Sequence, residues 1–194
     1  MATYTVKFYS GSYRARQNAA NADRAICFVA HHLNSDDNVT ADYALCDVAN
    51  NASRTSKAWA SWYVHKVAET FGVKVWSGGD GVCVGGMGGR GNSQIFYTDM
   101  PAILPEPLFC SNPRSAEILR GDSGRRQLAE ILAASIREFF PKGGLVAFSV
   151  GHRGKPKSSD AGAPVYAKSG EPAISEADLT ENILERAADL LAAK

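Results

Sequence analysis

The chain has 194 residues, a length that fits one domain with a substantial core. Apolar residues make up 45% and charged residues 21%, and 21 basic against 20 acidic residues leave a net charge of +1. This balance excludes a global basic field for nucleic acid, and no segment approaches the ~20 apolar residues of a membrane span. We therefore expect one globular domain, 1–194, with no nucleic-acid partner and no membrane span.

The chain's N-terminal stretch and its cysteines bear on where the protein is made. Met1–Tyr9 carries one lysine and no long apolar run, so it does not resemble a secretory signal. Cys27, Cys46, Cys83 and Cys110 include no C-x-x-C pair and no zinc-ribbon spacing. We expect a protein made in the cytoplasm without a signal peptide, with reduced cysteines rather than disulfides.

The first half of the chain alternates between strand and helix patterns. Tyr4–Tyr9 alternates with period two, Asn18–Arg24 is a short alanine-rich helix candidate, and Ala25–Ala30 is an apolar run of strand length. Ser56–Phe71 carries large apolar residues at spacings of three and four, which predicts a core-packing helix. His65 lies off that face, so we expect it in solvent.

A glycine-rich stretch, Ser77–Gly91, follows. It contains G-x-G-x-x-G at Gly86–Gly91, but the dinucleotide fingerprint needs a helix next, and Ser93–Tyr97 looks like a strand. We expect a mobile loop that borders a site. Further elements are a strand at Ala102–Leu104, a helix cap at Ser111 or Asn112, a helix at Gly124–Phe140, a strand at Leu145–Val150 and a helix capped by Ser175. The alternation predicts an α/β domain with helices flanking a mainly parallel or mixed sheet.

Three short apolar strands run into polar residues that a core would not accommodate. His32 follows the first, Glu106 the second and His152 the third. Ligands in open α/β sheets bind at the carboxyl ends of the strands, so these side chains would converge. Glu176 lies in the first turn of the last helix, in line with its apolar stripe; taken alone, it is more simply a partner of the helix dipole.

Taken together, these four residues predict a metal site. Two imidazoles and a carboxylate are the ligand set of an open catalytic zinc site, and a second carboxylate can serve as general base. For each histidine alone, a hydrogen-bonded structural residue is a serious alternative, but for all four residues together that alternative is weaker.

The motifs resemble the zinc-dependent N-acetylmuramoyl-L-alanine amidases of the amidase 3 type. Arg16–Asn21 is similar to the R-x-x-x-A-N helix of that family, and Phe28–Asn34 to its strand ending in serine-x-His-x-Asn, with Ala30 in place of the serine. Met100–Pro113 is similar to the strand that bears the catalytic glutamate, with Pro105 where a small apolar residue is usual. The resemblance assigns His32 rather than His31 as a zinc ligand and Glu106 as the catalytic residue.

The other two ligands come from motifs that the family ordinarily places first. Leu145–Gly154 and Asp160–Ala163 resemble its opening G-H-G and D-x-G-A motifs, and Ser175–Thr180 resembles its E-x-x-L helix start. The resemblance implies that His152 and Glu176 complete the zinc site. Because these motifs come last here, we expect a circularly permuted domain with the junction near residues 140–144.

The resemblance implies hydrolysis of the amide between N-acetylmuramic acid and L-alanine in peptidoglycan. Because we see no signal peptide and no separate wall-binding domain, we expect a monomeric phage endolysin, with a protein exported by a dedicated secretion machine and a cytoplasmic recycling enzyme as the alternatives. The enzyme would act on the cell wall, and the route by which it is released to the wall is unknown. Arg90, in the glycine-rich stretch, is a candidate substrate contact. The alternatives are a zinc amidase or peptidase with another substrate, and a catalytically silent wall-binding module.

Overall fold

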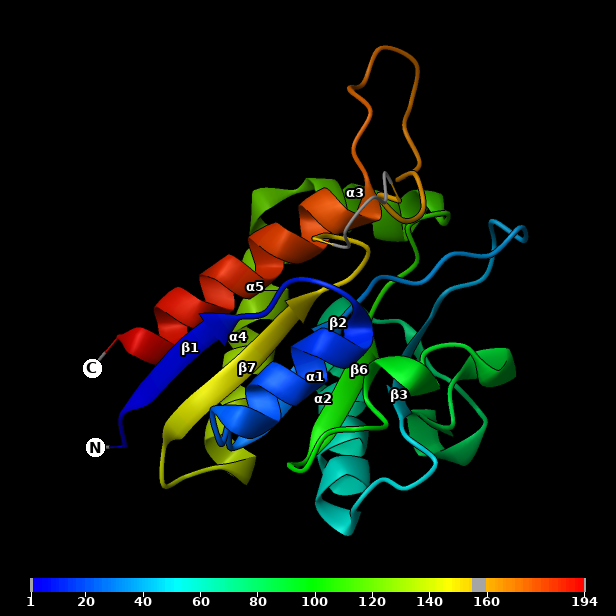
Figure 1. Cartoon of the computed structure of the whole chain (residues 1–194). Coiled ribbons are helices and arrows are strands. Elements are labelled where there is room, and N and C mark those ends of the chain that lie inside the picture. Colours follow the sequence, from blue (N-terminus) through cyan, green and yellow to red (C-terminus); the bar gives the residue numbers. More distant parts are fainter. Residues whose placement is uncertain (1, 155–159, 194) are drawn as a thin grey trace.

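A twisted seven-stranded sheet runs through the middle of the protein (Figure 1). The computed structural model describes residues 2–154 and 160–193; Met1, residues 155–159 and Lys194 lie outside them. The strand order is β1-β7-β2-β6-β3-β4, and β5 also pairs with β3. The strands are β1 (Tyr4–Phe8), β2 (Cys27–His31), β3 (Tyr43–Val48), β4 (Lys74–Val75), β5 (Val82–Val84), β6 (Ala102–Glu106) and β7 (Gly144–Val150).

The sheet is mixed, because one pair of neighbouring strands is antiparallel. β3 runs antiparallel to β6, whereas β1, β7, β2 and β6 are parallel to one another, as are β3, β4 and β5. The carboxyl ends of β7, β2 and β6 therefore meet at one edge. The prediction of an α/β domain with a mixed sheet is confirmed.

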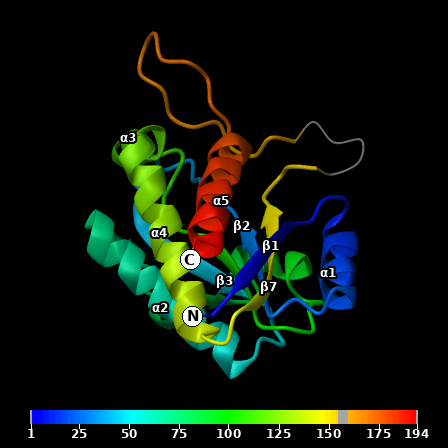
Figure 2. The same ribbon diagram turned by 90° about the vertical axis from the view of Figure 1, so that its left-hand side faces the viewer.

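Helices cover both faces of the sheet, with α1 on one face and the other helices opposite (Figure 2). Strand β2 shows why the sequence requires two covered faces. Its side chains alternate between two apolar clusters, Cys27 and Val29 in the larger one and Phe28 and Ala30 in the smaller one. The helices are α1 (Tyr13–Ala22), α2 (Arg54–Phe71), α3 (Pro113–Arg120), α4 (Asp122–Phe139) and α5 (Glu176–Ala192).

The helix starts agree with the caps in the sequence, although α1 begins five residues and α2 and α4 each begin two residues before the predicted start. Helix α1 begins at Tyr13, before the predicted Asn18, because the side chain of Ser12 caps it by accepting from the Ala15 N–H. Asn112 caps α3, and Ser175 forms a capping box with Asp178 at the start of α5. His65 is exposed on α2 and pairs with Asp80, as expected for a residue off the packed face.

Two predictions for the middle of the chain are wrong. Residues 93–97 are not a strand: Asn92–Gln94 forms a short 3-10 turn, and the buried side chain of Gln17 bonds the backbone on both sides of Gln94. The glycine-rich stretch is not all loop, because it contains β5. Strand β3 was not predicted at all.

The two ends of the described chain lie close together. Ala2 and Ala193 line one surface hollow together with Pro141 from the turn between α4 and β7, and both views show the ends on the same side (Figures 1 and 2). That turn is closed by the Gly143 N–H, which donates to the Phe140 carbonyl. None of the described helices is long and apolar enough to cross a membrane. Cys27, Cys46, Cys83 and Cys110 are free and buried.

Candidate metal centre and active site

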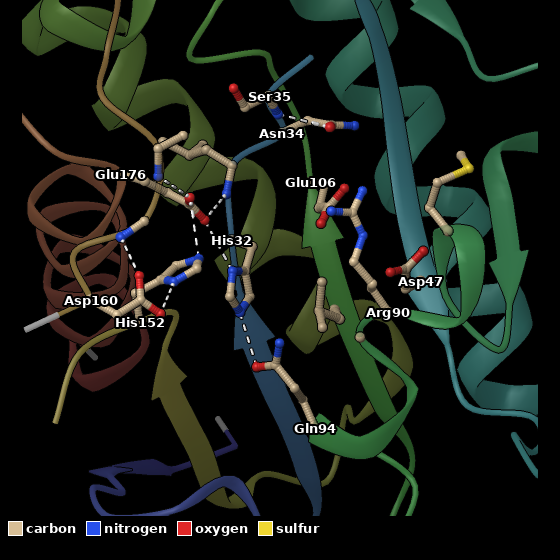
Figure 3. Close-up of a pocket in the computed structure, with 16 residues that line it drawn as sticks. His32, Asn34, Ser35, Asp47, Arg90, Gln94, Glu106, His152, Asp160 and Glu176 are labelled. Carbon is tan, nitrogen blue, oxygen red and sulfur yellow. Dashed lines mark hydrogen bonds and ion pairs between the residues drawn. The ribbon is translucent and has the colours of Figure 1, made fainter. Parts of the chain in front are cut away.

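His32, His152 and Glu176 converge at the carboxyl edge of the parallel strands (Figure 3). His32 directly follows β2, His152 comes two residues after β7, and Glu176 is the first residue of α5. Each offers one ligand atom, and these atoms all lie within 4.8 Å of one another. Strands β2 and β7 are adjacent in the sheet, so residues 120 positions apart in sequence become neighbours.

Glu176 is the centre of this cluster, with only 3% of its surface exposed. One carboxylate oxygen accepts from the Leu33 N–H and lies 3.0 Å from Nδ1 of His32. The other accepts from the Ala163 N–H and lies 3.2 Å from Nε2 of His152. Burial alone would raise the pKa of Glu176, but its contacts with the two histidines outweigh burial and lower it. The carboxylate is therefore anionic, as a metal ligand must be.

Two glycines permit the close approach of these side chains. A Cβ at Gly151 would lie 2.7 Å from the His32 ring, and a Cβ at Gly162 would lie 2.5 Å from a Glu176 oxygen. His152 itself has a left-handed backbone, with φ of 60°. This conformation is uncommon outside glycine and is tolerated where surrounding contacts hold it. The glycines of the two motifs thus have a steric role beside the candidate metal ligands.

His152 is oriented by a second carboxylate. Its Nδ1 lies 2.9 Å from Oδ2 of Asp160, which leaves Nε2 directed towards Glu176. Burial lowers the pKa of His152, but the two carboxylates together raise it. A carboxylate on the remote nitrogen is the usual support of a metal-binding histidine.

The donor set fits zinc. Two imidazoles and one carboxylate, gathered at a buried position that opens into a cavity, match a catalytic zinc site that keeps a position for water. The fit to zinc is judged from these three donors.

The cavity beside the cluster has a volume of about 370 Å³ and includes Glu106 in its wall. Glu106 is the last residue of β6 and is only partly exposed. Burial, together with the negative charges of Asp47 and Glu176, raises its pKa to about 8, although Arg90 and His152 act in the opposite direction. A carboxyl group with a pKa near neutrality can both accept and donate a proton.

Asp47 is a cavity residue that the sequence analysis missed. It lies on β3 opposite Leu104, on the same sheet face as Glu106, and is 2% exposed. Burial raises its pKa to about 7, against the lowering effects of Cys83, the Met87 backbone and Arg90. A lone acid inside the apolar run of residues 43–48 was the available signal, because carboxylates are rarely buried without a reason.

The segment after β5 forms another wall of the cavity. Arg90, the predicted substrate contact, is exposed and borders the cavity next to Glu106 (Figure 3). Gln94 also borders it, and its carboxamide oxygen lies 3.0 Å from Nε2 of His32. Nothing in the sequence pattern singled out Gln94, because this contact spans 62 positions.

Arg16 and Asn21, from the helix motif, lie outside the cluster and support it. The Arg16 guanidinium, 1% exposed, donates to the Ser149 hydroxyl and to the Val150 and Arg153 carbonyls, so it fixes the chain on both sides of His152. The Asn21 side chain donates to the Tyr97 carbonyl and accepts from the Asp99 N–H, just after the turn that carries Gln94. His31 is fully buried, and burial lowers its pKa to about 3, so it is neutral.

Solved structures share this fold. An N-acetylmuramoyl-L-alanine amidase from Clostridium difficile 630 matches with a TM-score of 0.56 and 24% identity, and the catalytic domain of CwlV from Bacillus (Paenibacillus) polymyxa var. colistinus with 0.55 and 23%. AmiC2 of Nostoc punctiforme matches with 0.54 and 19%, over 66% of this chain and 65% of its own. The first two alignments each cover 67% of this chain and 66% of the other, so this chain spans just under two thirds of those structures. No curated protein sequence matches significantly.

A family comparison gives the clearest assignment. The sequence model described as Amidase_3, N-acetylmuramoyl-L-alanine amidase, matches residues 3–138, more than two thirds of the chain. The matched span contains His32 and Glu106, whereas His152 and Glu176 lie beyond it. On this evidence, the chain belongs to the N-acetylmuramoyl-L-alanine amidase family.

Proposed function

We propose that the protein is a zinc-dependent enzyme that hydrolyses the amide between N-acetylmuramic acid and L-alanine in peptidoglycan. One observation carries the proposal: the fold joins His152 and Glu176, which the family match does not reach, to His32 inside it. The result is a complete three-ligand set beside the cavity that Glu106 borders. A silent wall-binding module would have no need of this arrangement.

Each residue has a separate role in the proposed reaction. His32, His152 and Glu176 would hold the ion, and zinc at such a site supplies a Lewis acid that activates water and polarises a carbonyl. Glu106 accepts a proton from the attacking water at its carboxylate and later donates it to the departing alanine nitrogen. Its raised pKa suits both steps, since protonated and ionised forms are both accessible near neutral pH.

Arg90 is proposed as a substrate contact. Its side chain is exposed beside the cavity, and its positive charge is close enough to lower the pKa of Glu106. A guanidinium at this position can bind a carboxylate or carbonyl of a peptide. Replacing it should weaken substrate binding more than it slows the chemical step.

Glu106→Gln tests the mechanism, because it preserves side-chain size and removes the proton acceptor. We expect zinc to remain bound and the rate of wall hydrolysis to fall by about 10²–10⁴-fold. The assay is the loss of turbidity of purified cell walls with and without a chelator, and the control is Glu138→Gln on the exposed side of α4. A fully active Glu106→Gln protein that retains its zinc would exclude this role.

Mass spectrometry of the released muropeptides separates the proposed activity from its alternatives. Free L-alanine amino termini on released stem peptides indicate the amidase reaction. Cleavage inside the stem peptide would identify a zinc peptidase instead. Binding to walls without any released product would identify a silent module.

We further infer that the domain is a circular permutant of the ordinary family order. The family match ends at residue 138, just before the turn at 140–143, and the strand and helix after it supply His152 and Glu176. Ala2 and Ala193 lie close enough to share one surface hollow, so joining them requires only a short linker.

A rearranged gene tests the permutation. Residues 143–193, placed ahead of residues 2–142 through a short linker, should fold, bind zinc and be matched by the family model across both parts. A rearranged sequence that matches no more than residues 3–138 would contradict the permutation.

We also propose that the protein acts on the cell wall as a monomeric endolysin, and that another factor releases it. Light scattering of the purified protein tests the monomer. Lysis that requires a separately expressed membrane pore tests the release route.

A further inference from the structure

The two proposed metal-binding histidines are supported through opposite ring nitrogens. His152 presents Nε2 to Glu176 and places Nδ1 2.9 Å from Asp160. His32 presents Nδ1 to Glu176 and places Nε2 3.0 Å from the Gln94 carboxamide oxygen (Figure 3). Each ring thus has one nitrogen at the cluster and an oxygen acceptor at the other nitrogen.

The acceptor decides where the single proton of a neutral imidazole lies. A carboxamide oxygen can only accept, so its contact favours a proton on Nε2 of His32, whereas the Glu176 carboxylate attracts a proton to Nδ1 until a metal ion takes that place. Nδ1 is the nitrogen that faces Glu176, and we assign it as the ligand atom of His32. If the amide nitrogen donated instead, the proton would lie on Nδ1 and block metal binding.

Gln94 is held firmly enough to have this effect. The fully buried Gln17 donates to the Ser93 carbonyl and accepts from the Tyr97 N–H, so it fixes the backbone on both sides of Gln94. The Gln94 N–H donates to the Gly91 carbonyl, and the next residue, Ile95, is buried in the smaller apolar cluster. The carboxamide therefore comes from an anchored turn.

We propose that Gln94 is a positioning residue that fixes the Nε2–H tautomer of His32 and thereby prepares Nδ1 to bind the metal. This inference rests on the proposed zinc site. The segment after the glycine-rich stretch would then support metal binding in addition to bordering the cavity. Removing such outer partners typically weakens metal affinity by about 10–100-fold.

Zinc affinity, measured by competition with a chromogenic chelator, tests the proposal in four variants of the full chain. Gln94→Leu keeps the approximate size and removes the acceptor, and Gln94→Ala covers the case in which leucine disturbs folding. Gln94→Glu keeps an acceptor at the same position. Ser93→Ala, on the exposed neighbouring side chain, is the matched control.

We expect about 10–100-fold weaker zinc binding for the leucine and alanine variants, and affinity within about threefold of the parent for the glutamate and Ser93→Ala variants. The absorption spectrum of the cobalt-substituted protein gives a second readout. Its visible bands should change in Gln94→Leu and return in Gln94→Glu, which a purely structural role would not produce.

The outcomes separate this inference from the proposed function. A parent protein that binds no zinc overturns both. A parent that binds zinc, with folded leucine and alanine variants of unchanged affinity, overturns only the role of Gln94. Equal weakening in the glutamate variant would show that an acceptor at this position does not determine zinc affinity, and this also overturns the proposal.

Discussion

Replacing Asp47 by Asn should stabilise the protein relative to the parent by an amount that grows as the pH rises from 5 to 8. Asp47 is 2% exposed on β3, and burial raises its pKa from 3.8 to about 7. The folded-state pKa thus lies above the unfolded value. The carboxyl group weakens the fold progressively as the pH rises from about 4 to about 7, because the unfolded chain ionises first.

The size of the effect follows from these two pKa values. Each pKa unit corresponds to about 1.4 kcal/mol, so the loss of stability across the whole interval is about 4 kcal/mol. Between pH 5 and pH 8, roughly two units remain, which corresponds to about 3 kcal/mol. Asn does not ionise, so the stability difference between Asp47→Asn and the parent should grow by this amount over that range. Any pH-independent cost of the amide cancels in the comparison.

Urea unfolding of both proteins at pH 5, 6, 7 and 8, with chelator present, measures this difference. Asp37→Asn, at an exposed loop position, is the control and should follow the parent at every pH. Removing the negative charge of Asp47 also lowers the pKa of Glu106, which changes the curve in the same direction. Parallel stability curves for Asp47→Asn and the parent would refute the assignment of a costly buried carboxyl group.

Three further changes have expected outcomes. Zinc at 100 times its dissociation constant should stabilise the protein by about 2.7 kcal/mol, which raises Tm by roughly 5–10 °C, and His32→Ala should abolish the shift. Gly162→Ala should weaken zinc binding and cost about 1–3 kcal/mol, because its Cβ would lie 2.5 Å from a Glu176 oxygen; an unchanged Tm and affinity would contradict the steric argument. Arg120→Ala should cost about 1–2 kcal/mol and speed proteolysis near Tyr166, since Arg120 donates to three carbonyls of residues 165–172; an unchanged cleavage rate would exclude this anchoring role.

The sequence determined the elements that have strong local patterns. The apolar runs before His32 and His152 required strands buried on both faces, and the capping pattern at Ser175 set the start of α5. These features placed the three candidate ligands at the ends of elements, where one edge of the sheet can bring them together. The resemblance to the amidases then distinguished His32 from His31 and Glu176 from Glu106.

Only the tertiary structure decided how these elements meet. The pairing of β2 with β7 brings His32 and His152 together, and strand pairing between distant segments leaves no local trace in the sequence. Asp47 likewise reaches the cavity only because β3 pairs antiparallel with β6. The segment of Gln94 has the sequence pattern of a strand, but hydrogen bonds from the side chains of Gln17 and Asn21 hold it in a turn. The partner on the far side of each histidine ring, Gln94 for His32 and Asp160 for His152, comes from another part of the fold, so the sequence alone could not predict the orientation of the two rings.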